Sequence, residues 1–123
     1  MSNVLKFNLV STVVPVTLQN GETFVEYELR EMRAADRDTY LDTVSDRLRL
    51  DANGKPAGIK KFDGMQTDLV SRCLFSKADG KPVKRDIIQG WPSSVVQGLY
   101  SEAQKLNKLN VDEEKVVGEA KKD

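Results

Sequence analysis

The spacing of apolar residues changes at Arg33, and this change constrains the fold more than any other feature of the chain. Before Arg33, the segment TFVEYELR (23–30) alternates inward and outward positions with the period of a half-buried strand. After Arg33, apolar residues recur at helical spacing, in the set Tyr40, Leu41, Val44 and Leu48. The sequence therefore predicts an α+β fold, with a small N-terminal antiparallel sheet followed by three to four amphipathic helices.

The sheet is expected to be built on a hairpin. The β-rich runs TVVPVTL (12–18) and TFVEYELR (23–30) flank Asn20-Gly21, which favours a tight turn with these two residues at the positive-φ positions. Pro15 cannot donate a hydrogen bond to a neighbouring strand, so its strand is expected at a sheet edge. Residues 5–9 also alternate apolar and polar side chains, and they predict a further half-buried strand.

Three helical segments follow the first one, and turn residues separate them. DANGKPAG (51–58) ends the first helix, and Asp63 is the predicted N-cap of the second, with Gln66 completing a capping box. A short helical turn is expected around Ile87 and Ile88, and Pro92 introduces the last helix. The inner stripe of the second helix is predicted to comprise Met65, Leu69, Val70, Cys73 and Leu74, and that of the last helix Val95, Val96, Leu99, Tyr100, Ala103, Leu106 and Leu109.

Length and composition indicate one soluble domain. The 123 residues are 39% apolar and 31% charged, and we expect a single domain over residues 1–110 and a flexible charged tail over 111–123. No apolar run approaches the roughly 18 residues of a membrane helix, and Pro15 interrupts the apolar N-terminal region, so no signal peptide is expected. With one cysteine no internal disulfide forms. The expected location is the cytoplasm.

The stretch SKADGKPVKRD (76–86) places a glycine before a lysine, as a phosphate-binding loop does. Such a loop also needs a glycine five residues before Gly80 and a Ser or Thr after Lys81. Phe75 and Pro82 occupy those positions. We therefore interpret the segment as a connector between helices.

The residues needed for catalysis are missing or badly placed. The chain has no histidine, which excludes Ser-His-Asp and Cys-His nucleophilic sites. Cys73 lies in an apolar stripe, where a thiol is usually inert packing. The acidic residues of the first helix are predicted to face solvent rather than a metal; they are Asp36, Asp38, Asp42 and Asp46. We expect no enzymatic activity, cofactor or metal.

Charge is balanced overall but uneven along the chain. Lys plus Arg and Asp plus Glu each number 19, and this balance argues against a dedicated nucleic-acid binder. Between Lys55 and Arg85, eight basic residues face three aspartates, a surplus of five. This stretch is either a solvated basic surface or a patch that meets an acidic partner.

Three stretches, in this order, resemble the tail assembly chaperones of long-tailed bacteriophages. NGETFVEYELREMRAADRDTYLD (20–42) is similar to that family's hairpin, "LRE" segment and "DRDxYL" helix start. FDGMQTDLVSRCLFSKADGKPV (62–83) is similar to its aromatic-x-Gly-hydrophobic-Gln helix and "DGKPV" turn. IIQGWPSSVVQGLYSEAQKLNKLN (87–110) is similar to its "WPxSV" helix start and the apolar helix that ends in "LN". The similarity covers roughly residues 18–110.

The resemblance implies a non-catalytic protein of the host cell cytoplasm that is absent from the mature virion. Such chaperones bind the tape measure protein, a very long helical protein, keep it soluble and help tail-tube subunits polymerise around it. The resemblance thus implies the tape measure protein as partner and leaves the major tail protein and a second copy of the chain as further partners, with neither nucleic acid nor membrane involved. In many family members a ribosomal frameshift also yields a longer form, which this sequence does not reveal.

Candidate partner-binding residues lie near the start of the last helix. Trp91 precedes Pro92 and is interpreted either as core packing or as a binding anchor. We also expect the last helix to leave part of its stripe for a partner; the residues concerned are Val96, Leu99, Tyr100 and Ala103. The alternative is that this stripe completes the core of the monomer.

Three other functional classes are kept beside the chaperone. The chain is alternatively a structural tail component retained in the virion, such as a tail-tube or connector protein, whose sheet would extend across subunits by edge pairing. A small regulator that binds nucleic acid through residues 55–85 would show a steep salt dependence of binding. An enzyme comes last, for lack of residues to perform the chemistry.

Overall fold

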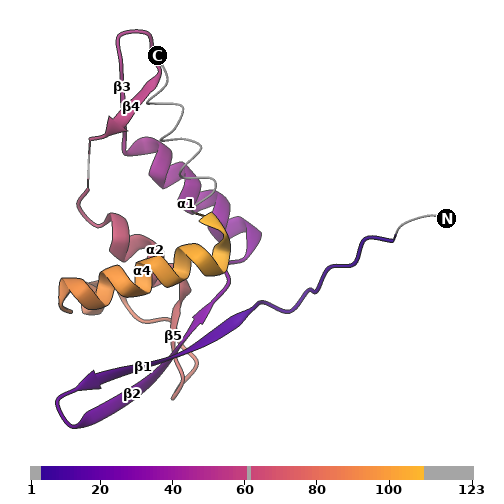
Figure 1. Cartoon of the computed structure of the whole chain (residues 1–123), viewed down its shortest axis with the longest axis vertical. Coiled ribbons are helices and arrows are strands. Elements are labelled where there is room, and N and C mark those ends of the chain that lie inside the picture. The colour runs from indigo at the N-terminus through magenta and orange to yellow at the C-terminus, as the bar shows by residue number, and fades with distance from the viewer. Residues whose placement is uncertain (1–3, 61, 110–123) are drawn as a thin grey trace.

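The computed structural model describes residues 4–60 and 62–109 and has the expected α+β architecture (Figure 1). The first regular element is a hairpin, and the chain continues mainly in helices, with short strands between them. The elements are β1 (Val13–Asn20), β2 (Thr23–Arg30), α1 (Ala34–Asp46), β3 (Leu48–Leu50), β4 (Pro56–Ile59), α2 (Met65–Cys73), β5 (Leu74–Ser76), α3 (Arg85–Gln89) and α4 (Ser93–Asn107). The predicted tail over 111–123 lies outside the described residues.

The main sheet has three antiparallel strands in the order β1-β2-β5. Leu29 of β2 pairs with Leu74 of β5, and both side chains are fully buried on the face that packs against the helices. On the opposite face, the Arg30 guanidinium lies 4.2 Å from the centre of the Phe75 ring. Figure 1 shows the β1–β2 hairpin projecting beyond the helices, so only the half of it near Leu29 contributes to the core.

The hairpin is as predicted, but its turn is of a different type. The register pairs Asn20 with Thr23, so the two central turn residues are Gly21 and Glu22 rather than Asn20 and Gly21. Among them only Gly21 has a positive φ, +62°, as expected for the first central position of a type II′ turn. The prediction placed the turn one residue too early. It took Asn20-Gly21 as the two central residues because Asn-Gly is the preferred central pair of a type I′ turn.

Residues 5–9 do not form the predicted half-buried strand. The segment is extended but pairs with no described strand, and it projects away from the rest of the chain (Figure 1). Phe7 is 85% and Leu9 100% exposed, and Leu5 is also largely exposed. The alternation of residue types was correctly recognised, but alternation alone does not supply the neighbouring strand that would bury one face.

Two short strand pairings were missed. Residues 51–58, interpreted as a plain connector, belong to a second hairpin in which β3 pairs with β4. Leu48, assigned to the first helix, lies in β3, and Leu74, assigned to the second helix, opens β5. Strands of three or four residues are too short to show a period of two, so the sequence carried only the Asn53-Gly54 turn signal.

The second helix begins differently from the prediction. Its N-cap is Gly64, with φ of +73°, and no capping side chain bonds to the first turn, so Asp63 is not the N-cap and Gln66 completes no capping box. Two arginines from other elements bind this corner instead. Arg47 Nη1 donates to the Asp63 carbonyl at 2.7 Å, and Arg85 Nη2 donates to the Gly64 carbonyl at 3.3 Å.

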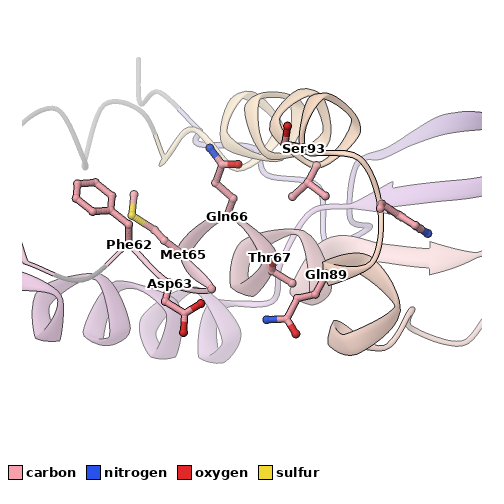
Figure 2. A pocket seen from close by; sticks show the side chains of 10 residues that line it. Phe62, Asp63, Met65, Gln66, Thr67, Gln89 and Ser93 are labelled. Atoms are coloured by element: carbon pink, nitrogen blue, oxygen red, sulfur yellow. The ribbon is translucent and has the colours of Figure 1, made fainter.

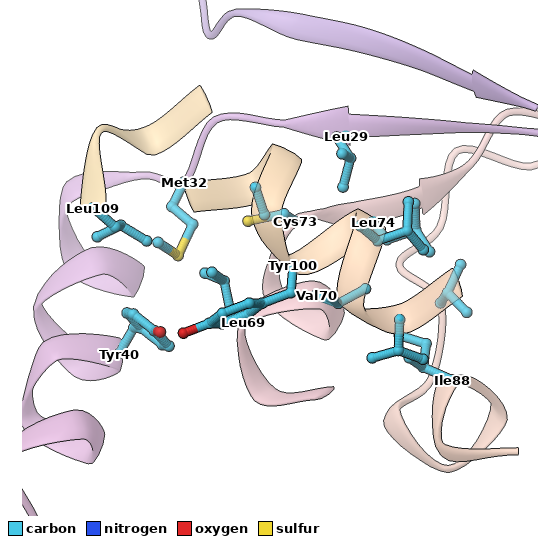
Figure 3. Close-up of a cluster of buried hydrophobic side chains, with 14 residues drawn as sticks. Leu29, Met32, Tyr40, Leu69, Val70, Cys73, Leu74, Ile88, Tyr100 and Leu109 are labelled. Atoms are coloured by element: carbon cyan, nitrogen blue, oxygen red, sulfur yellow. The ribbon is translucent and has the colours of Figure 1, made fainter. Parts of the chain in front are cut away.

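The core lies between the inner face of the main sheet and the helices, and α2 and α4 contribute half of its buried residues (Figure 3). The predicted stripes of both helices are largely confirmed by burial of their members. In α3, Ile88 is fully buried, whereas Ile87 points outward. The buried cluster comprises Leu29, Met32, Tyr40, Leu69, Val70, Cys73, Leu74, Val83, Ile88, Val96, Leu99, Tyr100, Ala103 and Leu109.

Candidate functional site

The apolar stripe of α4 belongs to the core of the monomer. Val96, Leu99 and Tyr100 are each less than 9% exposed, and Ala103 is fully buried. Figure 3 shows Tyr100 between the α2 residues Leu69 and Val70, with its hydroxyl directed toward Tyr40. This burial is what the core alternative for the stripe predicts, although Val96 also lines one surface cleft and its neighbour Val95 lines another.

Trp91 is the predicted site residue that remains accessible. It lies in the connection between α3 and α4. Its backbone N–H donates to the Ile88 carbonyl at 3.0 Å, and the next residue, Pro92, is the N-cap of α4. The indole ring meets Tyr27 of β2 edge-on, with ring centres 5.8 Å apart and planes at 66°. This contact fixes a half-buried Trp91 as a wall between two clefts.

The larger cleft has a volume of about 730 Å³ and lies between the start of α2 and the start of α4. Figure 2 shows Phe62 and Met65 side by side at one end, and Thr67 and Gln89 at the other. Gln66 and Ser93 approach from α2 and α4 respectively. The remaining lining comes from Asp63, Gly64, Trp91 and Val96. An aromatic–methionine pair beside neutral polar groups suits an adaptable apolar ligand rather than a charged one.

The smaller cleft lies on the other side of Trp91, between the distal half of the hairpin and the start of α4. Its volume is about 290 Å³, which is room for one large side chain rather than for a helix. Its apolar walls are Leu18, Val25, Tyr27, Trp91, Pro92 and Val95, and Gln19 and Asn20 close the end near the turn. Val25 is 41% exposed, because the hairpin extends past the helices that cover its other end.

Neither cleft is built to bind an anion. Asp63 is the only charged residue among those that line the two clefts, and no lysine or arginine lines either of them. Recognition of a nucleic-acid backbone depends on cationic side chains. The clefts therefore favour contact with uncharged, apolar surfaces.

A buried acidic residue that sequence reasoning did not single out is Asp68 of α2. Its Oδ1 lies 3.2 Å from Arg72 Nε and 3.9 Å from Arg85 Nη1, while Oδ2 is buried without a hydrogen-bond partner among the described residues. We interpret Asp68 as an ion-pair link between α2 and Arg85 of α3.

The single cysteine is packed as predicted. Cys73 is fully buried, and burial raises the pKa of its thiol from 9.0 to about 11, although a hydrogen bond from Asn107 opposes this shift. A thiol with so high a pKa carries almost no thiolate at neutral pH, and the thiolate is the nucleophile. Cys73 is thus unsuited to catalysis in the folded chain.

The glycine–lysine connector and the acidic residues of α1 lie where the sequence predicts them. Residues 77–79 form a turn in which Lys81 N–H bonds to Asp79 Oδ1, and Gly80 has φ of +69°, so the glycine–lysine stretch follows β5 as a connector. Asp36, Asp38, Asp42 and Asp46 are exposed on α1. Within residues 4–60 and 62–109, no group of three or more metal-binding side chains comes together. No helix in the described part of the chain is long and apolar enough to cross a membrane.

The clefts were only partly visible in the sequence. Trp91 was singled out, but Met65 was assigned to an inner stripe, Gln66 to a capping box and Phe62 to no site. No local pattern reports where α2 and α4 approach each other. Comparison of the chain with family models, with curated proteins and with solved structures finds no match.

Proposed function

We propose that the chain is a phage tail assembly chaperone that binds apolar helical segments of a tape measure protein, keeps them soluble and assists tail-tube polymerisation. The observation that carries the proposal is the larger cleft, which offers Phe62, Met65 and Trp91 at the surface of a small folded domain. The sequence resemblance of residues 18–110 supports the same role.

The chemistry of the cleft suits such a client. A long amphipathic helix in water associates through its apolar stripe, and a carrier lowers that tendency by covering part of the stripe. Met65 and Phe62 adapt to different apolar side chains, since methionine is flexible and polarisable. The polar rim formed by Gln66, Gln89 and Ser93 is able to bond to helix side chains without demanding a particular charge.

The test is co-expression of the chain with the gene that lies just downstream of its own. A very long helical protein encoded there is expected to be soluble only when the chain is present. Phe62 is 70% exposed, so Phe62→Glu should leave the fold intact and return the client to the insoluble fraction. Leu50 of β3 is 60% exposed and lies outside the larger cleft, so Leu50→Glu is the matched control and should keep the client soluble.

Two outcomes would count against this proposal. If the client stays equally soluble with Phe62→Glu and with the wild-type chain, the larger cleft is not the client-binding site. Recovery of the polypeptide in purified virions would instead favour the component retained in the particle.

A further inference from the structure

The N-terminal arm, residues 4–11, is the least buried apolar segment that the structure describes. Val4, Leu5, Phe7, Leu9 and Val10 are all at least 74% exposed. Five large apolar side chains within seven consecutive residues form a patch of the kind that marks an interaction site. The hydrogen bond from Val10 N–H to Asn8 Oδ1 is local and fixes no contact with the rest of the chain.

The free edge of β1 is a poor template for this arm. Glu31 N–H donates to the Thr12 carbonyl, so the backbone groups of Thr12 face β2. Because these groups alternate along an antiparallel strand, those of Val13, Pro15, Thr17 and Gln19 face the open edge. Pro15 has no N–H to donate there, which interrupts any added strand in the middle of β1. The exposed apolar side chains of the arm are therefore its main means of binding.

The smaller cleft beside Trp91 is the apolar surface that fits one of these side chains. Its volume of about 290 Å³ accommodates a single aromatic ring between Val25, Tyr27 and Trp91. Phe7 is the aromatic residue of the arm. Aromatic side chains in such pockets usually dominate binding energy.

The arm of the same molecule is badly placed to fill this cleft. The arm joins β1 at Val13, whereas the cleft is formed by the other end of the strand, Leu18 to Asn20. Figure 1 shows the arm leading away from the hairpin. To reach its own cleft, the arm would have to reverse direction and run back along the edge that Pro15 interrupts. An arm of eight residues extends about 26 Å, which is enough to reach across to a neighbouring molecule.

Charge also favours a second copy as the source of the arm. Lys6 precedes Phe7, and Glu22 lies in the hairpin turn beside the cleft residues Gln19 and Asn20. A docked Phe7 would place these opposite charges at the same rim. The chain as a whole has zero formal net charge, so two copies do not repel each other.

We propose that the N-terminal arm docks on a second copy of the chain, with Phe7 seated in the cleft formed by Leu18, Val25, Tyr27 and Trp91. Reciprocal exchange of two arms would close a symmetric dimer, in which each molecule both gives and receives an arm. The proposal concerns the smaller cleft and does not depend on the identity of any client in the larger one.

Sedimentation of the purified full-length chain over a range of concentrations tests the proposal without a client. The wild-type chain is expected to dimerise, and Phe7→Glu should weaken dimerisation by about 30-fold, the effect of removing an interface hot spot. Val25→Glu on the receiving side should weaken it similarly. Ile87→Glu, an exposed apolar residue of α3 outside the smaller cleft, is the matched control and should leave the association unchanged.

Disulfide trapping identifies the occupant. In a Cys73→Ala background, a mixture of the Phe7→Cys and Val25→Cys chains should form a disulfide-linked pair of two molecules. A wild-type chain that stays monomeric, or dimerisation that Phe7→Glu leaves intact, overturns the proposal. So does a Phe7→Cys/Val25→Cys chain that closes its disulfide within one molecule at low concentration.

Discussion

The side chain of Asn107 accepts a hydrogen bond from the backbone N–H of Met32 at 2.7 Å, across a sequence separation of 75 residues. The same side chain donates to the Ala103 carbonyl at 2.8 Å and to Cys73 Sγ at 3.4 Å. In addition, the Arg37 guanidinium donates to the Asn107 carbonyl. The end of α4 is thus fixed to the segment that joins β2 to α1.

Asn107→Ala is expected to lower the free energy of unfolding by about 2 to 3 kcal/mol. The substitution leaves the buried Met32 N–H without its acceptor, and an unsatisfied buried donor costs its full desolvation penalty. Urea unfolding followed by circular dichroism measures the change. Ser101→Ala, on an exposed position of the same helix, should stay within about 0.5 kcal/mol of wild type. Equal effects of the two variants would contradict a structural role for Asn107.

Gly64→Ala is expected to destabilise the chain by about 1 to 2 kcal/mol. Gly64 has φ of +73°, which costs an L residue about that much, and an added Cβ would lie 2.6 Å from Arg85 Nη2. Gly98→Ala is the opposing control, because Gly98 lies inside α4 and an added Cβ meets nothing within 4 Å. That variant should raise the midpoint of thermal unfolding by a few degrees, corresponding to about 0.5 to 1 kcal/mol. Stabilisation by both variants would show that the Gly64 corner tolerates an L residue.

Stability is expected to fall between about pH 9 and pH 11 because of Cys73. Burial raises the pKa of this thiol from 9.0 to about 11, so over this range the unfolded chain loses the thiol proton while the folded chain keeps it. The unfolded state then binds fewer protons, and the free energy of unfolding decreases with pH. The contribution of the protonated Cys73 thiol to the free energy of unfolding is fully present below pH 9, and about 2 to 3 kcal/mol of it is lost by pH 11. Urea titrations of wild type and Cys73→Ala at pH 8 and pH 10.5 measure the difference, and parallel losses in both would exclude the thiol as its source.

The sequence allowed the helices and their buried faces to be predicted where the apolar period was long. The α4 stripe from Val95 to Leu109 spans four turns, and its members are buried or partly buried as expected. Within the described residues, the predictions were wrong where the outcome depended on a distant neighbour. Residues 5–9 alternate like a strand but lack a partner, and the start of α2 is held by Arg47 and Arg85 rather than by the Asp63 side chain.

The clefts could not be predicted for the same reason. Phe62 and Trp91 are separated by 28 other residues, and their approach depends on how α2 packs against α4. Sequence reasoning did identify Trp91, because a single tryptophan before a helix-initiating proline is noticeable without any tertiary information. The residues that form the clefts together with Trp91 come from other elements. The local sequence pattern does not encode how those elements pack.

Tyr100→Glu is expected to abolish cooperative unfolding. Tyr100 is only 8% exposed and packs in the cluster that holds Tyr40, Leu69 and Val70, so the substitution removes an aromatic side chain and places a carboxylate among apolar groups. Loss of the ring alone costs about 3 to 5 kcal/mol, which is a large share of the stability of a domain of this size. Phe62→Glu, on the exposed rim of the larger cleft, should retain a sigmoidal urea transition within about 0.5 kcal/mol of wild type. A folded Tyr100→Glu chain that no longer keeps the proposed tape measure client soluble would instead assign the α4 stripe to the partner interface.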